Sequence, residues 1–156
     1  MTAKAAPFAS REITINRVFA APRALVFAAW TEPKRMAQWW GPHGFTNPVC
    51  ELDVRPGGAL HIVMRAPDGT EYPMNGVFRE VVTPERLAFT FAALDQGKPV
   101  LEGLTTATFA EDGDGTKLTV HSRATALVDY AARMIEGMEA GWTQSIERLE
   151  ALVKRP

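Results

Sequence analysis

The stretch at residues 127–153, LVDYAARMIEGMEAGWTQSIERLEALV, decides the fold of this chain. At steps of four, four, four, three and four residues it repeats apolar side chains, namely Met134, Met138, Trp142, Ile146, Leu149 and Val153. That spacing is typical of one face of an α-helix, and charged side chains occupy the opposite face. At about 1.5 Å per residue, we expect one helix roughly 40 Å long that covers a whole sheet.

Two glycines, Gly137 and Gly141, stand inside this expected helix. A glycine inside a helix costs about 1 kcal/mol relative to alanine, so each requires a structural reason. Close approach to a strand is one reason, and room for a ligand beneath the helix is another. The methionines of the stripe fit both, because methionine fills irregular gaps and adapts to varied partners.

Composition limits the class of protein. The chain has 156 residues, 46% hydrophobic and 22% charged, which is typical of one globular domain. A formal net charge of -1 argues against nucleic acid or an anionic membrane as a partner held by bulk electrostatics. No apolar run approaches the ~20 residues that insert into a membrane.

We expect a flexible N-terminal arm at residues 1–10 and a single domain at 11–156. The lone Cys50 has no partner for an internal disulfide and predicts a cytoplasmic location.

The chain before the last helix reads as strands and two short helices. Residues 12–19 are β-branched and alternate, which predicts a strand. A proline begins each of the short helices expected at 22–30 and 33–40, and Gly41-Pro42 ends the second. Six more strands, separated by short turns rich in glycine, proline and acidic residues, are expected at 48–55, 59–66, 72–82, 86–93, 103–110 and 116–123.

Short turns predict antiparallel neighbours, because parallel strands need long crossovers. We therefore expect an α+β fold. A curled antiparallel sheet of about six or seven strands surrounds the C-terminal helix, with the two short helices between strands one and two. A curled sheet around one helix rarely fills completely, and the gap is a natural apolar cavity.

Several motifs occur in the order of one known family. The run Trp30-Thr31-Glu32-Pro33, followed by Gln38-Trp39-Trp40-Gly41-Pro42, resembles the helical hairpin of the Hsp90-ATPase-activator-like family, part of the START-like or polyketide cyclase-like superfamily. Further matches are Arg55-Pro56-Gly57-Gly58, Asp68-Gly69-Thr70-Glu71-Tyr72, Gly76-Val77-Phe78-Arg79-Glu80, Pro84-Glu85-Arg86-Leu87 and Gly141-Trp142-Thr143-Gln144-Ser145-Ile146-Glu147-Arg148-Leu149. The resemblance covers residues 13–152, nearly the whole chain.

This resemblance implies the helix-grip fold and a choice of partners. Members of the superfamily bind lipids, sterols, hormones or polyketides, and some act as cyclases or hydrolases. The family is named after the C-terminal domain of a eukaryotic co-chaperone, but single-domain members lack the N-terminal domain that carries much of the activation. A small apolar or amphipathic ligand, a homodimer and a chaperone partner are therefore the partners that the resemblance leaves open.

The expected ligand-binding residues are those that strand parity or the helical stripe directs toward the cavity, together with the three tryptophans of the helical hairpin. They are Trp30, Trp39, Trp40, Leu60, Ile62, Met64, Met74, Phe78, Phe89, Phe91, Met134, Met138 and Trp142. The same residues also suit an ordinary packed core. The tryptophans either seal the core between hairpin and sheet or form a cavity mouth, where an amphipathic ring suits a ligand with polar and apolar parts.

No motif defines a reaction, and the catalytic residues are unknown. His43, His61 and His121 are too scattered for a metal site, and residues 112–115 (DGDG) lack the other ligands of a calcium loop, so we expect neither a metal nor a cofactor. An enzyme would need a titratable group with a shifted pKa in the cavity. Besides His43, the candidates are Glu51, Asp53, Arg65, Tyr72, Glu80, Glu102 and Arg123.

Three functions fit these observations. The first is binding of a small apolar or amphipathic molecule beneath the C-terminal helix. The second is an enzyme of cyclase or hydrolase type that uses the same cavity. The third is a co-chaperone-like interaction module, which an exposed apolar patch on the sheet would favour.

Overall fold

The computed structural model describes residues 9–154. Within them, seven strands form one antiparallel sheet in the order β1-β7-β6-β5-β4-β3-β2. The strands are β1 (Ala9–Phe19), β2 (Thr46–Leu52), β3 (Ala59–Arg65), β4 (Glu71–Val82), β5 (Arg86–Asp95), β6 (Lys98–Asp112) and β7 (Gly115–Ala126). The expected α+β helix-grip architecture is confirmed. Since β1 begins at Ala9, the last two residues of the expected arm lie in a strand, and the rest of it lies outside the described residues.

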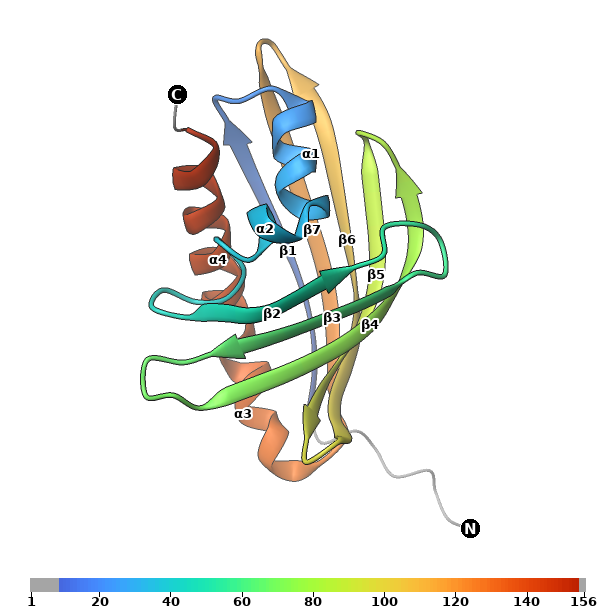
Figure 1. Cartoon of the computed structure of the whole chain (residues 1–156), viewed down its shortest axis with the longest axis vertical. Coiled ribbons are helices and arrows are strands. Elements are labelled where there is room, and N and C mark those ends of the chain that lie inside the picture. The colour runs from blue at the N-terminus through green and yellow to red at the C-terminus, as the bar shows by residue number, and fades with distance from the viewer. Residues whose placement is uncertain (1–8, 155–156) are drawn as a thin grey trace.

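The sheet curls around its helices. In Figure 1, β5, β6, β7 and β1 run along the molecule, whereas β2, β3 and β4 cross in front of the helices. Helices α1 (Arg23–Thr31) and α2 (Pro33–Met36) follow β1 and close one end of the concave face. The expectation of a second helix over residues 33–40 was too long. The N–H groups of Trp39 and Trp40 both donate to Met36 O in a closing turn, and Gly41 leaves helical geometry at φ +97°.

The C-terminal segment corrects the prediction of one unbroken helix. It consists of a 3-10 turn η1 (Asp129–Ala131), a short helix α3 (Ala132–Glu136) and the longer α4 (Met138–Val153). Gly137 separates α3 from α4 at φ -85° and ψ -1°, where its N–H still donates to Arg133 O. Glycine is the residue whose backbone leaves the helix most readily. At about 1.5 Å per residue, α4 spans roughly 24 Å rather than 40 Å.

Aromatic side chains fill the space between α1, α4 and one half of the concave face. Trp30 lies against Trp39, with ring centroids 4.8 Å apart, and edge-on to Phe109 at 5.9 Å. Trp39 also donates its indole N–H to Ala29 O at 2.8 Å. From α4, Ile146 and Leu149 reach the same cluster and are fully buried. We call this half of the interior the aromatic core.

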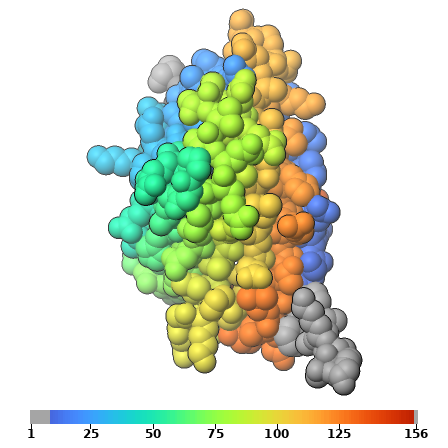
Figure 2. All heavy atoms as spheres, turned by 90° about the vertical axis from the view of Figure 1, so that its right-hand side faces the viewer, coloured from blue at the N-terminus to red at the C-terminus, as the bar shows by residue number. Residues whose placement is uncertain are grey.

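The convex face of the sheet is uncovered in the described structure. The face in Figure 2 is built of strands, chiefly β4 to β7, and no part of α4 is visible on it.

Inside the sheet, Phe91 of β5 pairs with Gly103 of β6. A Cβ at Gly103 would lie 2.0 Å from Arg123 O and 2.5 Å from the Phe91 ring. Only glycine fits there, because a side chain would collide with the strand backbone and with the Phe91 ring.

Candidate functional site

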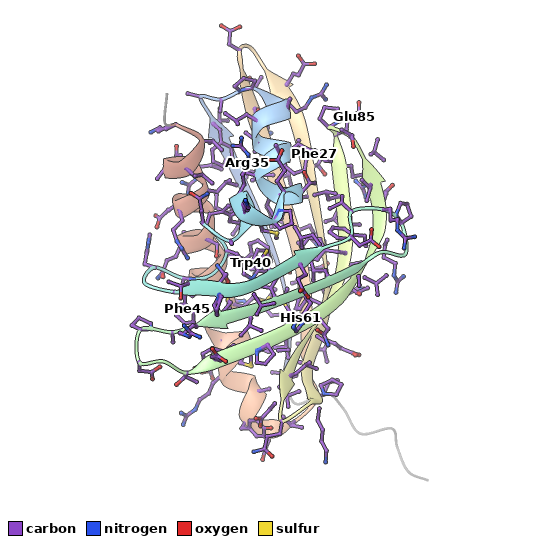
Figure 3. The ribbon with its side chains drawn as sticks, in the orientation of Figure 1. Phe27, Arg35, Trp40, Phe45, His61 and Glu85 are labelled. Atoms are coloured by element: carbon purple, nitrogen blue, oxygen red, sulfur yellow. The ribbon has the colours of Figure 1, made fainter. Side chains whose placement is uncertain are left out.

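A cavity of about 210 Å³ lies between the concave face and the C-terminal helices, at the end opposite the aromatic core. Strands β3 to β7 supply one wall, and α3 with the start of α4 supplies the other. Residues 40–42, which we call the rim loop, close one side. In Figure 3, Trp40 lies between α2 and β2, and Phe45 lies near the start of β2.

The cavity lining is rich in methionine and free of charge. Of the six methionines in the chain, Met64, Met74, Met134 and Met138 all line it. No aspartate, glutamate, lysine, arginine or histidine is among the lining residues. The hydroxyls of Tyr72 and Ser145 are the polar side-chain groups, besides the tryptophan indoles. Such a wall favours uncharged molecules, because burying an unpaired charge is costly.

Two tryptophans separate the cavity from the aromatic core. The Trp40 and Trp142 rings meet edge-on at 83°, with centroids 5.4 Å apart. Trp142 also stacks on the buried Trp30, at 16° and 6.1 Å. Each of these rings is therefore held by a neighbour on the core side, while its cavity side stays available. A rigid aromatic wall of this kind suits a ligand that packs by shape.

Helix α4 fixes the rim loop through polar contacts. Ser145 Oγ accepts from Gly41 N–H at 3.1 Å and donates to Gly141 O at 2.9 Å. The Arg148 guanidinium donates to the carbonyl oxygens of Trp40, Gly41 and Pro42 at 2.9–3.1 Å and to Gln38 O at 3.0 Å. Partial burial lowers the pKa of Arg148, although a guanidinium stays charged in proteins. These bonds keep the cavity wall in one shape.

Tyr72 and Met134 form the mouth of the cavity. Each is 38% exposed, on opposite sides of the opening, one from β4 and the other from α3. The Tyr72 ring packs beside Phe45, with centroids 6.1 Å apart. The opening therefore presents one phenol and one flexible thioether.

Comparison with known proteins identifies the family. The model of the family described as Activator of Hsp90 ATPase homolog 1-like protein matches residues 20–154. The chain belongs to this family. That confirms the resemblance seen in the Trp-Trp-Gly-Pro run and in the motif of the last helix. No curated protein matched the chain.

Solved structures of similar proteins share the family's fold. Protein NE0264 from Nitrosomonas europaea is 28% identical, with a TM-score of 0.78 over 92% of this chain and 94% of that one. Protein CV1439 from Chromobacterium violaceum is 30% identical, with a TM-score of 0.78 over 93% and 98%. The AHSA1 protein SPO3351 from Silicibacter pomeroyi is 25% identical, with a TM-score of 0.73 over 90% and 96%.

Seven of the thirteen expected ligand-binding residues line the cavity of this family member: Trp40, Met64, Met74, Phe91, Met134, Met138 and Trp142. The other six lie in the aromatic core instead, each at most 1% exposed: Trp30, Trp39, Leu60, Ile62, Phe78 and Phe89. Strand parity placed Leu60, Ile62, Phe78 and Phe89 on the concave face, but α1, α2 and the end of α4 fill that part of it, and Trp30 and Trp39 belong to this helical filling. Parity assigns a face and not a position along the strand.

Ten lining residues were not among the expected ligand-binding residues, although Tyr72 was a titratable candidate: Gly41, Pro42, Tyr72, Pro73, Ala93, Leu101, Ala124, Ile135, Gly141 and Ser145. Strand alternation contains a signal for some, since Ala93 follows Phe89 and Phe91 on one face and pairs with Leu101. Gly141 was noted, and its bare Cα borders the cavity, where an added Cβ would lie 3.9 Å from Pro42. Ile135 and Met134 of the short helix α3 both line the cavity, but Ile135 is buried whereas Met134 is 38% exposed.

The remaining candidates lie outside the cavity. His43 contacts Glu147 at 3.0 Å, His121 contacts Glu12 at 2.6 Å, and His61 contacts Asn75, all on the outer surface. Of the titratable candidates, Tyr72 alone lines the cavity. Among the described residues there is no cluster of three or more histidine, cysteine or acidic side chains that could hold a metal ion. No helix within residues 9–154 is long and apolar enough to cross a membrane.

Proposed function

We propose that this protein binds a small apolar or amphipathic molecule in the cavity between the curled sheet and α3–α4. The observation that carries the proposal is the lining itself: four methionines and two tryptophans enclose about 210 Å³ without a charged side chain. Concave sites lined by apolar and aromatic groups, with a few polar ones, are the usual form of small-molecule sites. Membership of the family is consistent with ligand binding.

An enzyme in the same cavity is a weaker alternative. General acid–base or nucleophilic chemistry needs a titratable or activated group within reach of the substrate. Ser145 has no base beside it, since its hydroxyl is engaged with Gly41 N–H and Gly141 O. The Tyr72 phenol lies at the mouth. The lining therefore supports binding and offers no reaction.

An interaction module is the second candidate, and it has its own surface. The convex face carries a depression of about 650 Å³ lined by β4 to β7, including Arg79, Glu102 and Arg123. This lining is mixed and polar, with Val77 as its strongly exposed apolar residue at 41%. A chaperone partner would be tested by substituting Arg79 and Arg123 there and measuring binding to the purified chaperone. A homodimer and a cytoplasmic location also stay predictions.

The experiment that tests ligand binding blocks the cavity at a position outside the aromatic core. Ala124 lines the cavity on β7, and Ala124→Leu would add three carbons to it. Ala92→Leu makes the same change on the convex face and serves as the control. Tryptophan fluorescence and thermal midpoints would be measured against cyclohexanol, 1-octanol and 2-naphthol.

The expected result is saturable binding of at least one probe by the wild type and by Ala92→Leu, with loss in Ala124→Leu. The thermal midpoint should rise with probe concentration, because a ligand that binds only the folded state stabilises it. Binding that survives Ala124→Leu unchanged, or no binding of any probe, would contradict the proposal.

A further inference from the structure

The size of the cavity limits its ligand. An apolar cavity of about 150 Å³ holds one benzene ring, and drug-sized ligands occupy about 300–1,000 Å³. At about 210 Å³, this cavity accommodates one ring or two fused rings, on the order of ten non-hydrogen atoms. Sterols and long acyl chains exceed that volume, so much of such a ligand would extend through the mouth into water.

The charge of the lining limits the ligand further. No ionisable side chain of either sign lines the cavity apart from the Tyr72 phenol at its mouth. The guanidinium of Arg148, behind the rim loop, is engaged with the three carbonyl oxygens of that loop and with Gln38 O. A carboxylate or ammonium group inside would therefore lose its hydration without gaining a counter-charge. The ligand that fits is neutral.

The chemistry of the walls separates flat aromatic ligands from saturated ones. Four thioethers reach the cavity from both walls, Met64 and Met74 from the sheet and Met134 and Met138 from the helices. Sulfur is polarisable and makes favourable contacts with aromatic rings. Trp40 and Trp142 add two indole rings that already prefer edge-on and stacked partners. A saturated ring of the same size gains none of these directional contacts.

We propose that this cavity is selective for a neutral aromatic molecule of one or two fused rings, held between Met64, Met74, Met134, Met138 and the indoles of Trp40 and Trp142. The inference rests on the proposed binding function and adds the ligand class to it. A hydroxyl or other small polar substituent lies toward the mouth beside Tyr72, where water reaches it.

The test compares ligands that differ in one property at a time. The probes are 2-naphthol, its saturated form decahydro-2-naphthol, the anion 2-naphthoate and the long-chain acid palmitate, titrated into the full chain by isothermal calorimetry at pH 7. We expect 2-naphthol to bind at least about tenfold more tightly than each of the others. The saturated alcohol is the more hydrophobic of the two, so simple partition into an apolar space would reverse the order.

The thioethers are tested by a substitution that keeps their volume. Met134→Leu combined with Met138→Leu removes two sulfurs from the cavity, and Met36→Leu removes one from the aromatic core as the control. The double variant should weaken 2-naphthol about threefold or more and leave decahydro-2-naphthol within about twofold. Circular dichroism and thermal midpoints would establish that both variants fold.

The outcomes separate this inference from the proposed function. Equal affinity for the aromatic and saturated alcohols, or equal losses for both in the double variant, overturns aromatic selectivity and leaves ligand binding intact. Tighter binding of 2-naphthoate or palmitate overturns the neutral, compact ligand class. No binding of any of the four probes, together with none in the earlier panel, overturns both proposals.

Discussion

The two halves of the interior share one sheet face and one helix, and yet they are built differently. Along β5 the inward side chains pass from Leu87 and Phe89, which are fully buried, to Phe91 and Ala93, which line the cavity. Along β3 they pass from Leu60 and Ile62 to Met64. Toward one end, large rigid groups fill the space; toward the other, flexible or small groups leave it open.

A buried polar contact marks the border between the halves. The hydroxyls of Thr105 and Ser122 bond to each other at 2.9 Å on neighbouring strands, and both residues are fully buried. On the core side of this pair lie Ala107 and Val120, and on the cavity side lie Gly103 and Ala124. The comparison teaches that a single sheet face can be filled by large aromatic side chains at one end and leave a cavity beside a smaller buried cluster at the other.

The largest expected difference in stability is between replacing a methionine by alanine in the aromatic core and making the same substitution at the cavity mouth. Met36 is 1% exposed in the aromatic core, whereas Met134 is 38% exposed at the mouth. Met36→Ala leaves a cavity in a packed region and should lower the free energy of unfolding by about 2–5 kcal/mol. Met134→Ala should cost less than about 1 kcal/mol, because its side chain is already partly hydrated. Urea denaturation of both variants measures this, and equal losses would contradict the division into halves.

Adding volume should give the same order, with the larger loss of stability at the core position. Ala107 and Ala124 face the same side of neighbouring strands, one in the core and one at the cavity. Ala107→Leu overpacks the core and should cost about 1–3 kcal/mol. Ala124 is itself buried, at 2% exposure, but it borders the cavity, so Ala124→Leu can extend into that space and should cost less than Ala107→Leu, about 1 kcal/mol. Thermal midpoints of the pair decide the point; a larger loss in Ala124→Leu would mean that the cavity is filled in solution.

The smallest expected effect concerns Cys50, which packs against the aromatic core from β2. Burial raises the pKa of this thiol to about 11. Because the folded state disfavours the thiolate, Cys50 contributes its full stability below the pKa of about 9 that it has in the unfolded chain. That contribution is lost as the pH rises toward 11. At pH 9, iodoacetamide should label the native chain about 50-fold more slowly than the urea-unfolded chain, since only the thiolate reacts. Similar rates in both states would show that β2 is open to solvent.

Sequence reasoning recovered the fold because its signals are local. Alternation in β5 and β7, proline at the start of α2 and the apolar spacing of α4 each express one element. The break at Gly137 was not predicted, because an interior glycine is compatible both with a continuous helix and with the end of one. Ile135 was also missed as a buried residue, and Met134 was expected beneath the helix.

The cavity could be expected in kind but not in position. Strand parity placed Phe78 and Phe89 on the same face as Met74 and Phe91, and it contains no information about which of them the helices cover. The rim loop could not be foreseen either, since it depends on Arg148 reaching carbonyl oxygens more than 100 residues away in the chain. Tertiary contacts of this kind leave no periodic signal in the sequence.

The most direct test of the account is a crystal structure of the protein grown with 6-bromo-2-naphthol, with the bromine located by its anomalous signal. We predict one dominant bromine site inside the cavity, between Trp142, Met138 and Met74, with the hydroxyl directed toward Tyr72. The aromatic core should keep its packing around Trp30 and Trp39. A bromine site on the convex face, or within the core between displaced rings, would contradict the claim that the open half of the interior is the binding site.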